Sequence, residues 1–201
     1  MSNGSFHLEL IIVMNIKAEF FETLYQYDSD PWRFASSSYE LYRYHQICSI
    51  IRHQKHKYTF EAGCSIGILT EKLAHFSEFV EAIDISPTAT SLALSRCNSL
   101  NNIKIHCSSL ENYSINPHTD LIILSEIGYY FTPEEWRLVL QKMLTTCVPP
   151  FYILASHWLG FSPDHLLSGD EVHSIINSLR AFQLRHQERH ENFRLDYWIK
   201  Q

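Results

Sequence analysis

Apolar residues occur along this chain in two alternating kinds of run. Short continuous runs occupy residues 58–62, 79–84, 103–107, 120–124 and 151–156. Between them lie segments with apolar residues three or four positions apart, at 68–76, 86–98, 133–146 and from Ser168 onward. The first kind is typical of strands buried on both faces, and the second of helices that bury one side. This alternation predicts a mostly parallel sheet with helices on both faces.

The two ends of the chain depart from this alternation. Residues 15–27 and 36–52 have helical spacing, with a break at Pro31, and the second segment carries Tyr39, Tyr42 and Tyr44. This aromatic stripe either packs in the core or belongs to a lid over a site. The last two runs, 182–191 and 193–199, are separated by so few residues that only an antiparallel hairpin can join them.

Composition narrows the class of protein. A chain of 201 residues suits one α/β domain, and its net charge of −6 without a lysine–arginine cluster argues against a nucleic-acid partner. No apolar run is long enough to span a membrane. The five cysteines are scattered without zinc-type spacing, which favours free thiols in a reducing, cytoplasmic compartment.

A glycine turn between Gly63 and Gly67 joins the first strand to the first helix of the sheet. Glycine allows a ligand to approach the backbone, and the first N–H groups of a helix are free to bind it. A dinucleotide fingerprint would need two further glycines, where this chain has Ser65 and Ile68. Glu61, at the end of the first strand, would repel phosphates but suits a cationic amino group. Asp84 ends the second strand at the distance expected of a ribose-binding acid.

The segments Glu-Ala-Gly-Cys-Ser-Ile-Gly-Ile-Leu-Thr-Glu-Lys-Leu-Ala (61–74) and Leu-Ser-Glu-Ile-Gly-Tyr-Tyr-Phe (124–131) carry a family resemblance. The chain resembles the class I S-adenosylmethionine (SAM)-dependent methyltransferases, and within them the NodS (nodulation protein S) branch. The resemblance extends over residues 15–201. It implies a doubly wound, Rossmann-like sheet with a C-terminal antiparallel hairpin, a helical lid over residues 15–53, and SAM as cofactor with S-adenosylhomocysteine (SAH) as product.

Ligands of such sheets bind beyond the carboxyl ends of the strands. We therefore expect a cofactor site made of Glu61, Gly63, Cys64, Gly67, Asp84, Ile85, Ser109, Leu110 and Ser125. Asp84 either binds the ribose or caps the next helix. Glu61 is either a salt-bridge partner or, as the family implies, an indirect contact of the methionine amino group. Ser109 stands where the family often has an aspartate near the adenine amino group, so the contact there would be weaker.

The chemistry is expected beside this cradle. Methyl transfer is mostly a matter of positioning, but an ammonium acceptor must first lose a proton. Glu126 and His157 are the candidate bases, with Tyr129 as a third catalytic candidate. Tyr130 and Trp158 are candidate substrate-binding residues, and these aromatic rings either face the sulfonium or fill the core.

Two other segments carry polar side chains. The connection 157–170 is either a substrate loop or a surface loop that ends in a helix cap. His186, Glu188 and His190 alternate along one strand, but their distance from the cradle argues against a metal site, and we expect none.

The sequence thus predicts a SAM-dependent methyltransferase. The NodS resemblance implies N-methylation of the free amine of an amino sugar, at the end of an oligosaccharide, or of a similar small molecule. The alternatives are a methyltransferase of another small molecule, or a binding or regulatory protein of the same fold without turnover. The expected partners are therefore small molecules or oligosaccharides, with neither nucleic acid nor membrane, and the oligomeric state stays open between monomer and homodimer.

Residues 1–14 look like an extension in front of the domain, because Met14 is followed by a sequence typical of a natural start. We hypothesise that this extension is disordered and that deleting it leaves folding and ligand binding intact.

Overall fold

The computed structural model describes residues 17–201, so the expectations for residues 1–14 lie outside the described residues. Residues 17–27 form the first described helix. The later helices are α2 (Ser38–Ile51), α3 (Ile68–Leu73), α4 (Pro87–Arg96), the short 3₁₀ turn η1 (Gly128–Tyr130), α5 (Pro133–Thr146) and α6 (Gly169–Ser178). The strands are β1 (His56–Ala62), β2 (Ser77–Asp84), β3 (Ile103–Cys107), β4 (Leu121–Ser125), β5 (Phe151–Trp158), β6 (Gln183–Arg189) and β7 (Phe193–Lys200).

Seven strands form one sheet in the order β3-β2-β1-β4-β5-β7-β6. The neighbours among β1–β5 are all parallel, whereas β7 runs antiparallel between β5 and β6. The chain moves outward from β1 to β3 and then returns to the other side of β1 with β4. This reversal creates a crevice beyond the carboxyl ends of β1 and β4, where open α/β sheets bind ligands. The predicted doubly wound sheet with a closing hairpin is confirmed.

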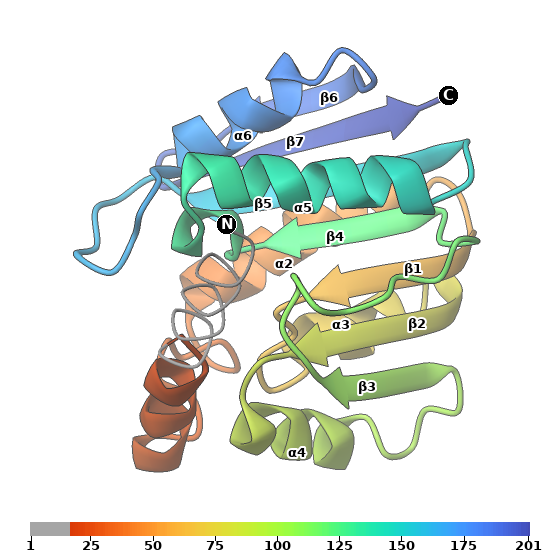
Figure 1. The fold of residues 1–201 in the computed structure, drawn as a ribbon. Helices are drawn as coiled ribbons and strands as arrows, with labels where there is room; N and C mark the ends of the chain where they lie inside the picture. Colours follow the sequence, from red (N-terminus) through yellow and green to blue (C-terminus); the bar gives the residue numbers. More distant parts are fainter. Residues whose placement is uncertain (1–16) are drawn as a thin grey trace, which may run out of the picture.

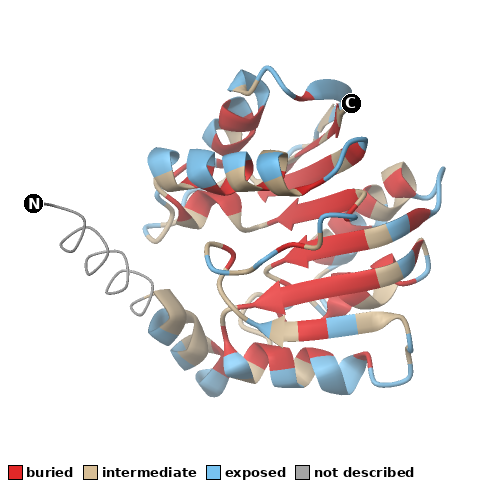
Figure 2. Cartoon of the chain, turned by 45° about the vertical axis from the view of Figure 1, so that its right-hand side comes forward, coloured by how far each residue is buried: buried red, intermediate tan, exposed pale blue. Residues whose placement is uncertain are grey.

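Two apolar cores lie on opposite faces of the sheet. One joins the sheet to α5 and α6 through Trp136, Leu140 and Val172, and α5 lies in front of the strands in Figure 1. The other joins it to α2, α3 and α4. The central strands are buried along most of their length: β4 is red throughout in Figure 2, and β1 is red from Thr59 to its end. Burial on both faces explains why these strands are continuous apolar runs.

Helix starts follow local chemistry. Ser86 caps α4 by accepting the N–H of Ala89, with Pro87 at the first helical position. Thr132 before α5 and Ser168 before α6 each form a capping box with the glutamate three residues later. These caps fix the points at which the chain leaves the carboxyl edge of the sheet.

The first helix buries a different side from the one that its apolar spacing indicated. Phe20, Leu24 and Tyr27 have the helical spacing of a buried face, but Phe20 and Tyr27 are 43% and 94% exposed. Tyr25 is buried instead, and Phe21 packs edge-on against Tyr130. The aromatic residues on both sides of this helix made its inner face ambiguous, and tertiary contacts decided it. In Figure 1 the helix, in red, lies beside the arrowheads of the parallel strands.

No helix within residues 17–201 combines the length and the apolar character that crossing a bilayer requires.

Candidate active site

A cavity of about 430 Å³ lies at the carboxyl edge of the sheet. Its wall combines the segments that follow β1 to β5 with side chains from the first helix and from α2. Twelve of the fourteen predicted site residues line it: Glu61, Gly63, Cys64, Asp84, Ile85, Ser109, Leu110, Ser125, Glu126, Tyr129, Tyr130 and Trp158. Gly67 and His157 are not among its lining residues.

The glycine turn has the left-handed backbone that its residues predicted. Gly63 has φ +71° and Gly67 has φ +81°, while Ser65 between them also has a positive φ of 51°. Only Gly63 faces the cavity, and a Cβ there would lie 2.9 Å from the Cδ1 atom of Ile127. At Gly67 a Cβ would meet Ala93 of α4 at 3.1 Å. Gly67 therefore serves the close packing of α3 on α4.

The Asp84 carboxylate organises the floor of the cavity. It accepts the backbone N–H of Ser65 at 2.8 Å and that of Ser86 at 3.0 Å, so it ties the glycine turn to the start of α4. Burial raises the pKa of Asp84 to about 6, although these backbone hydrogen bonds oppose the rise. The side chain thus holds the turn against the start of α4, whose cap is Ser86, and it also lines the cavity. Its contact with a ribose stays a prediction.

Glu61 lies at the end of β1, where its Oε2 atom accepts the Thr70 hydroxyl at 2.6 Å. Burial raises the pKa of Glu61 to about 7, and nearby Asp84 adds to the effect. Its contact is thus a neutral hydroxyl of α3, and no salt bridge to Glu61 occurs among the described residues.

Ser109 follows β3 and has a buried hydroxyl without a hydrogen-bond partner among the described residues. Buried hydroxyls are normally paired, so an unpaired one in a cavity wall is a natural contact for a ligand. Ser125, at the end of β4, differs because its hydroxyl accepts a hydrogen bond from Arg43.

The polar side chains of the cavity wall fit SAM. Six acidic residues line the cavity against two basic ones, Lys17 and Arg43. A cavity of this charge suits a sulfonium and an amino group and disfavours a pyrophosphate. Asp84, Glu61 and the unpaired Ser109 hydroxyl supply the polar groups that a ribose, an amino group and a base edge would require.

Glu126 has positive φ (55°), and both oxygens of its carboxylate contact other residues. Its Oε1 atom accepts the N–H of Trp158 at 2.9 Å and lies 3.6 Å from the guanidinium of Arg43, and its Oε2 atom accepts the Tyr129 hydroxyl. Burial raises the pKa of Glu126, while Arg43 opposes the rise. Glu126 therefore joins α2, η1 and the end of β5, and both of its oxygens already have protein partners.

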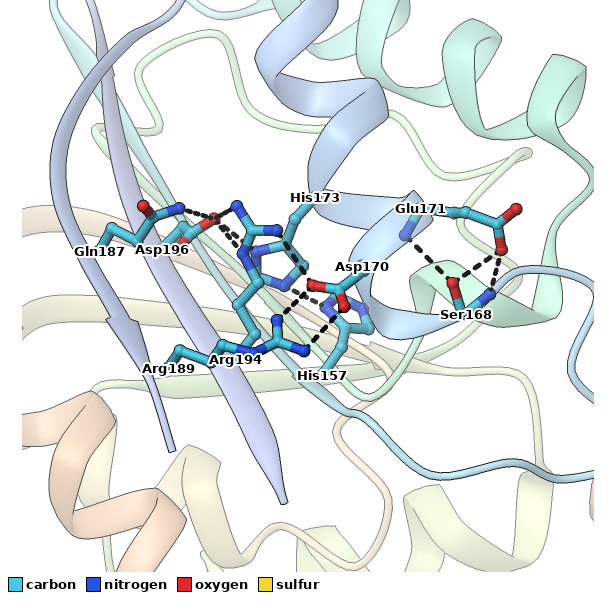
Figure 3. A network of polar contacts seen from close by, with 9 residues as sticks. All are labelled: His157, Ser168, Asp170, Glu171, His173, Gln187, Arg189, Arg194 and Asp196. Atoms are coloured by element: carbon cyan, nitrogen blue, oxygen red, sulfur yellow. Dashed lines mark hydrogen bonds and ion pairs between the residues drawn. The ribbon is translucent and has the colours of Figure 1, made fainter. Parts of the chain in front are cut away.

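His157 lies behind this wall. Its Nε2 atom accepts the N–H of Gly128 at 3.0 Å, so its Nδ1 atom carries the hydrogen that points to Nε2 of His173 at 3.1 Å. His173 in turn contacts Asp196 at 2.9 Å, and Figure 3 shows this chain continuing to Arg194 and Asp170. Burial lowers the pKa of His157 well below its ordinary value. The imidazole is neutral, occupied at both nitrogens and directed away from the cavity, so it supports η1.

Two cavity residues from the helical segments had no sequence signal. Arg43 of α2 is fully buried and bonds Glu40, three residues earlier, as well as Ser125. Tyr25 of the first helix donates its hydroxyl to Ser65 in the glycine turn. In a sequence, an arginine and a tyrosine within amphipathic helices look like ordinary surface or core residues. Only the structure shows that these two lie in the cavity wall.

The first helix is also attached at Glu22. Its carboxylate accepts the hydroxyls of Ser86 and Thr88 at 2.6 Å each and the N–H of Thr88 at 3.0 Å. Although burial raises its pKa, these hydrogen bonds lower it to about 2. An acid at the N-terminus of α4 also complements the helix dipole. The helix is thereby fixed beside Asp84 and the glycine turn.

Aromatic rings form the end of the cavity beyond Glu126. Tyr129 stacks on His165 with ring centroids 3.7 Å apart, and Tyr130 meets the same imidazole edge-on at 5.3 Å. Trp158 lies 6.1 Å from it. Asp164 also lines this end, so the connection 157–170 contributes both a carboxylate and an imidazole.

Alternating residues of β6 and the residue that follows it form a separate cluster outside the cavity, in which Glu188 bonds His186 and His190 at 2.7 and 2.8 Å. Across residues 17–201, no group of three or more histidine, cysteine or acidic side chains has an arrangement suited to a metal ion.

Comparison with known proteins identifies the relatives of this chain. The family model described as Nodulation protein S (NodS) matches residues 22–150. Nodulation protein S of Bradyrhizobium diazoefficiens is 30% identical over 167 residues, which cover 78% of each chain. Nodulation protein S of Rhizobium tropici is 30% identical over 122 residues, 60% of this chain and 51% of that protein.

Solved structures share the fold. The N-methyltransferase NodS from Bradyrhizobium japonicum WM9 in complex with SAH is similar with a TM-score of 0.75 and 21% identity, over 86% of this chain and 93% of that one. The magnesium protoporphyrin IX methyltransferase of Synechocystis PCC 6803 with bound SAM has a TM-score of 0.71 at 14% identity, over 94% and 97% of the two chains.

Proposed function

This chain belongs to the NodS family of SAM-dependent methyltransferases, and we propose that it methylates the nitrogen of a free amine on an amino sugar or a similar small molecule. The observation that carries the proposal is the continuity of the cavity. A cofactor half with Glu61, Gly63 and Asp84 opens directly into an acidic and aromatic half with Glu126 and Asp164. An amine acceptor and a methyl donor could therefore meet inside one enclosed space.

In the cofactor half, each polar group has a role that its chemistry suggests. Asp84 would accept ribose hydroxyls on the lone pairs left free by Ser65 and Ser86, and Glu61 would face the amino group. Gly63 would allow the ligand to lie against the backbone, and the Ser109 hydroxyl would bond the base. Bound SAM supplies a methyl group on a positively charged sulfur, which is an excellent leaving group.

In the acceptor half, charge selects the substrate class. Asp164 and Glu126 would attract an amine in its ammonium form, whereas an N-acetylated sugar has no such charge. The Tyr129 and Tyr130 rings restrict the space, and tyrosine faces attract cations. The residues therefore mainly hold and orient the two reactants, which is the main requirement of methyl transfer. The role of Glu126 is to position Tyr129 and Trp158 around the acceptor.

Calorimetric titration with SAH tests the cofactor half. We expect the native protein to bind SAH, Asp84→Ala to lose most of this affinity, and Glu78→Ala to retain it. Glu78 is a matched control because it is an exposed acid on the same strand. If the native protein does not bind SAH, the proposal is wrong.

Transfer of a labelled methyl group tests the acceptor half. Glucosamine oligomers with a free terminal amine should accept the label, and fully N-acetylated oligomers should not. Other small amines and hydroxyl compounds belong in the same screen. Binding of SAH without transfer to any amine would favour the binding or regulatory alternative.

A further inference from the structure

His165 is held in place at the acceptor end of the cavity. The backbone N–H groups of Leu166 and Leu167, the two residues that follow it, both donate to the carbonyl oxygen of Tyr129, at 2.7 and 3.2 Å. The N–H of His165 itself donates to the carbonyl oxygen of Ser162 at 3.1 Å. These hydrogen bonds hold the backbone around His165, and stacking on Tyr129 holds its imidazole ring.

The ring nitrogens of His165 have no hydrogen-bond partner among residues 17–201, and they are not among the fully buried unpaired atoms. This distinguishes His165 from the two bases that the sequence suggested. Glu126 already accepts from Trp158 and Tyr129 and pairs with Arg43, and both nitrogens of His157 are used by Gly128 and His173. Of the two histidines, only His165 offers an unoccupied ring nitrogen to a molecule in the cavity, whereas the Glu126 carboxylate is held by Arg43, Tyr129 and Trp158.

We propose that His165 is the residue that takes a proton from the acceptor ammonium. The inference rests on the proposed function, because it assigns a role within the same site. It assigns a catalytic role to a residue of the connection 157–170, for which the sequence left a substrate loop and a surface loop open.

The step balances as follows. One N–H bond of the acceptor ammonium breaks, its electron pair stays on nitrogen, and the proton forms an N–H bond with the imidazole. The freed lone pair then forms the bond to the methyl carbon while the carbon–sulfur bond breaks and its electrons remain on sulfur. The imidazolium, which is partly exposed, releases its proton to water.

The surroundings keep His165 in the form that can accept a proton. Burial lowers the pKa of His165, and Asp164 beside it only partly offsets this. The other titratable groups facing it are Tyr129 and Tyr130 on η1 and His157 on β5, with Glu126 behind Tyr129. Burial also raises the pKa of both tyrosines, so neither carries charge at neutral pH. The imidazole is therefore neutral at pH 7, as a base must be.

The first test compares methyl transfer to a glucosamine tetramer by the native protein, His165→Phe and His165→Gln. The phenylalanine variant keeps a ring on Tyr129 but has no lone pair. We expect kcat/KM at pH 7 to fall about 100-fold in both, the lower end of the range for general bases. Above the pKa of the acceptor amine the base is no longer needed, so the ratio of native to variant rate should approach one. His118→Phe, at an exposed histidine outside the cavity wall, is the control and should match the native protein.

A second readout does not depend on turnover. In the SAH complex with labelled histidines, NMR should show the His165 ring titrating below pH 6.5 and its signals shifting when the glucosamine tetramer is added. The signals of His118 should stay unchanged. SAH affinity should be the same in His165→Phe and the native protein, which also verifies that the variant folds.

The outcomes separate the two proposals. If the native protein binds SAH but transfers methyl to no amine, the proposed function fails. If the native protein is active and His165→Phe stays within about threefold of it at pH 7, with ring signals unmoved by the tetramer, the role of His165 is overturned while the proposed function stands.

Discussion

Replacement of Arg43 by methionine is the most informative test of how the acceptor wall is held together. Arg43 is fully buried in α2, bonds Glu40 at 3.1 Å through its Nε atom, and lies 3.6 Å from Glu126. Methionine keeps most of the volume and removes the charge. The buried carboxylate of Glu40 and the largely buried one of Glu126, whose side chain is 14% exposed, would then have lost their cation, and Ser125 its donor.

The expected cost follows from the burial of these groups. Breaking a buried ion pair by removing one partner destabilises a protein by about 3–5 kcal/mol, because the remaining charge stays out of water. For a chain of this size that corresponds to a fall in Tm of about 6–20 °C. Because an unpaired buried carboxylate can be neutralised by a proton, we expect the loss to be smaller at pH 5 than at pH 8.

Urea and thermal unfolding of the ligand-free protein measure the effect. The double variant Arg43→Met with Glu126→Gln should lose less stability than the two single variants lose in total, by at least about 1 kcal/mol. The reason is that the double variant has no unpaired Glu126 charge to keep out of water. Arg137→Met, at an exposed arginine of α5, is the control and should stay within about 0.5 kcal/mol of the native protein. A loss below about 1 kcal/mol in Arg43→Met, or additive effects in the double variant, would refute the reasoning.

Three further predictions concern the cofactor half. Glu61 has a raised pKa of about 7, so its ionisation opposes folding as pH rises from the unfolded value near 4.3. At pH 8 without ligand, the free energy of unfolding of Glu61→Gln should therefore exceed that of the native protein by about 1–3 kcal/mol, and the difference should vanish near pH 4; a gain that persists in acid would contradict this origin. Gly63→Ala should lose about 1–2 kcal/mol of stability and bind SAH more weakly in calorimetry, because φ is +71° there, and unchanged binding would show that the ligand does not approach this backbone. Glu22→Gln should weaken SAH binding several-fold and lower the Tm at pH 7, because the helix over the cavity loses charge-assisted hydrogen bonds from Ser86 and Thr88; Glu19→Gln, at an exposed acid of the same helix, should match the native protein in both measurements.

The cofactor half could be predicted because its parts are close in sequence. A strand, a turn, a helix and a second strand follow one another between residues 56 and 84, and each has a local signal: apolar runs, glycines with positive φ, and a carboxylate at a strand end. Parallel strands joined by helices bring their carboxyl ends to one edge. Asp84 and the glycine turn were therefore expected to meet, and they do so through the N–H of Ser65.

The acceptor half depends on contacts between distant segments. Arg43 meets Glu126 across 83 positions and Tyr25 meets Ser65 across 40, so no local pattern connects them. The orientation of the His157 side chain could not be predicted from the sequence either. Successive strand residues point to opposite faces, so His157 and its neighbour Trp158 could not both face one cavity. The sequence did not reveal which of the two would point inward, and packing against α6 placed His157 beside His173.

What the sequence by itself determined is thus the sheet, its order of secondary structure and the cradle, because periodicity, glycine conformation and capping act over a few residues. What only the tertiary structure decided is which polar side chains are buried, paired or left unoccupied. A buried arginine, a histidine within a hydrogen-bonded chain and a histidine with an unoccupied nitrogen look alike in a sequence. Their protonation and reactivity depend on desolvation and on partners supplied by other segments of the fold.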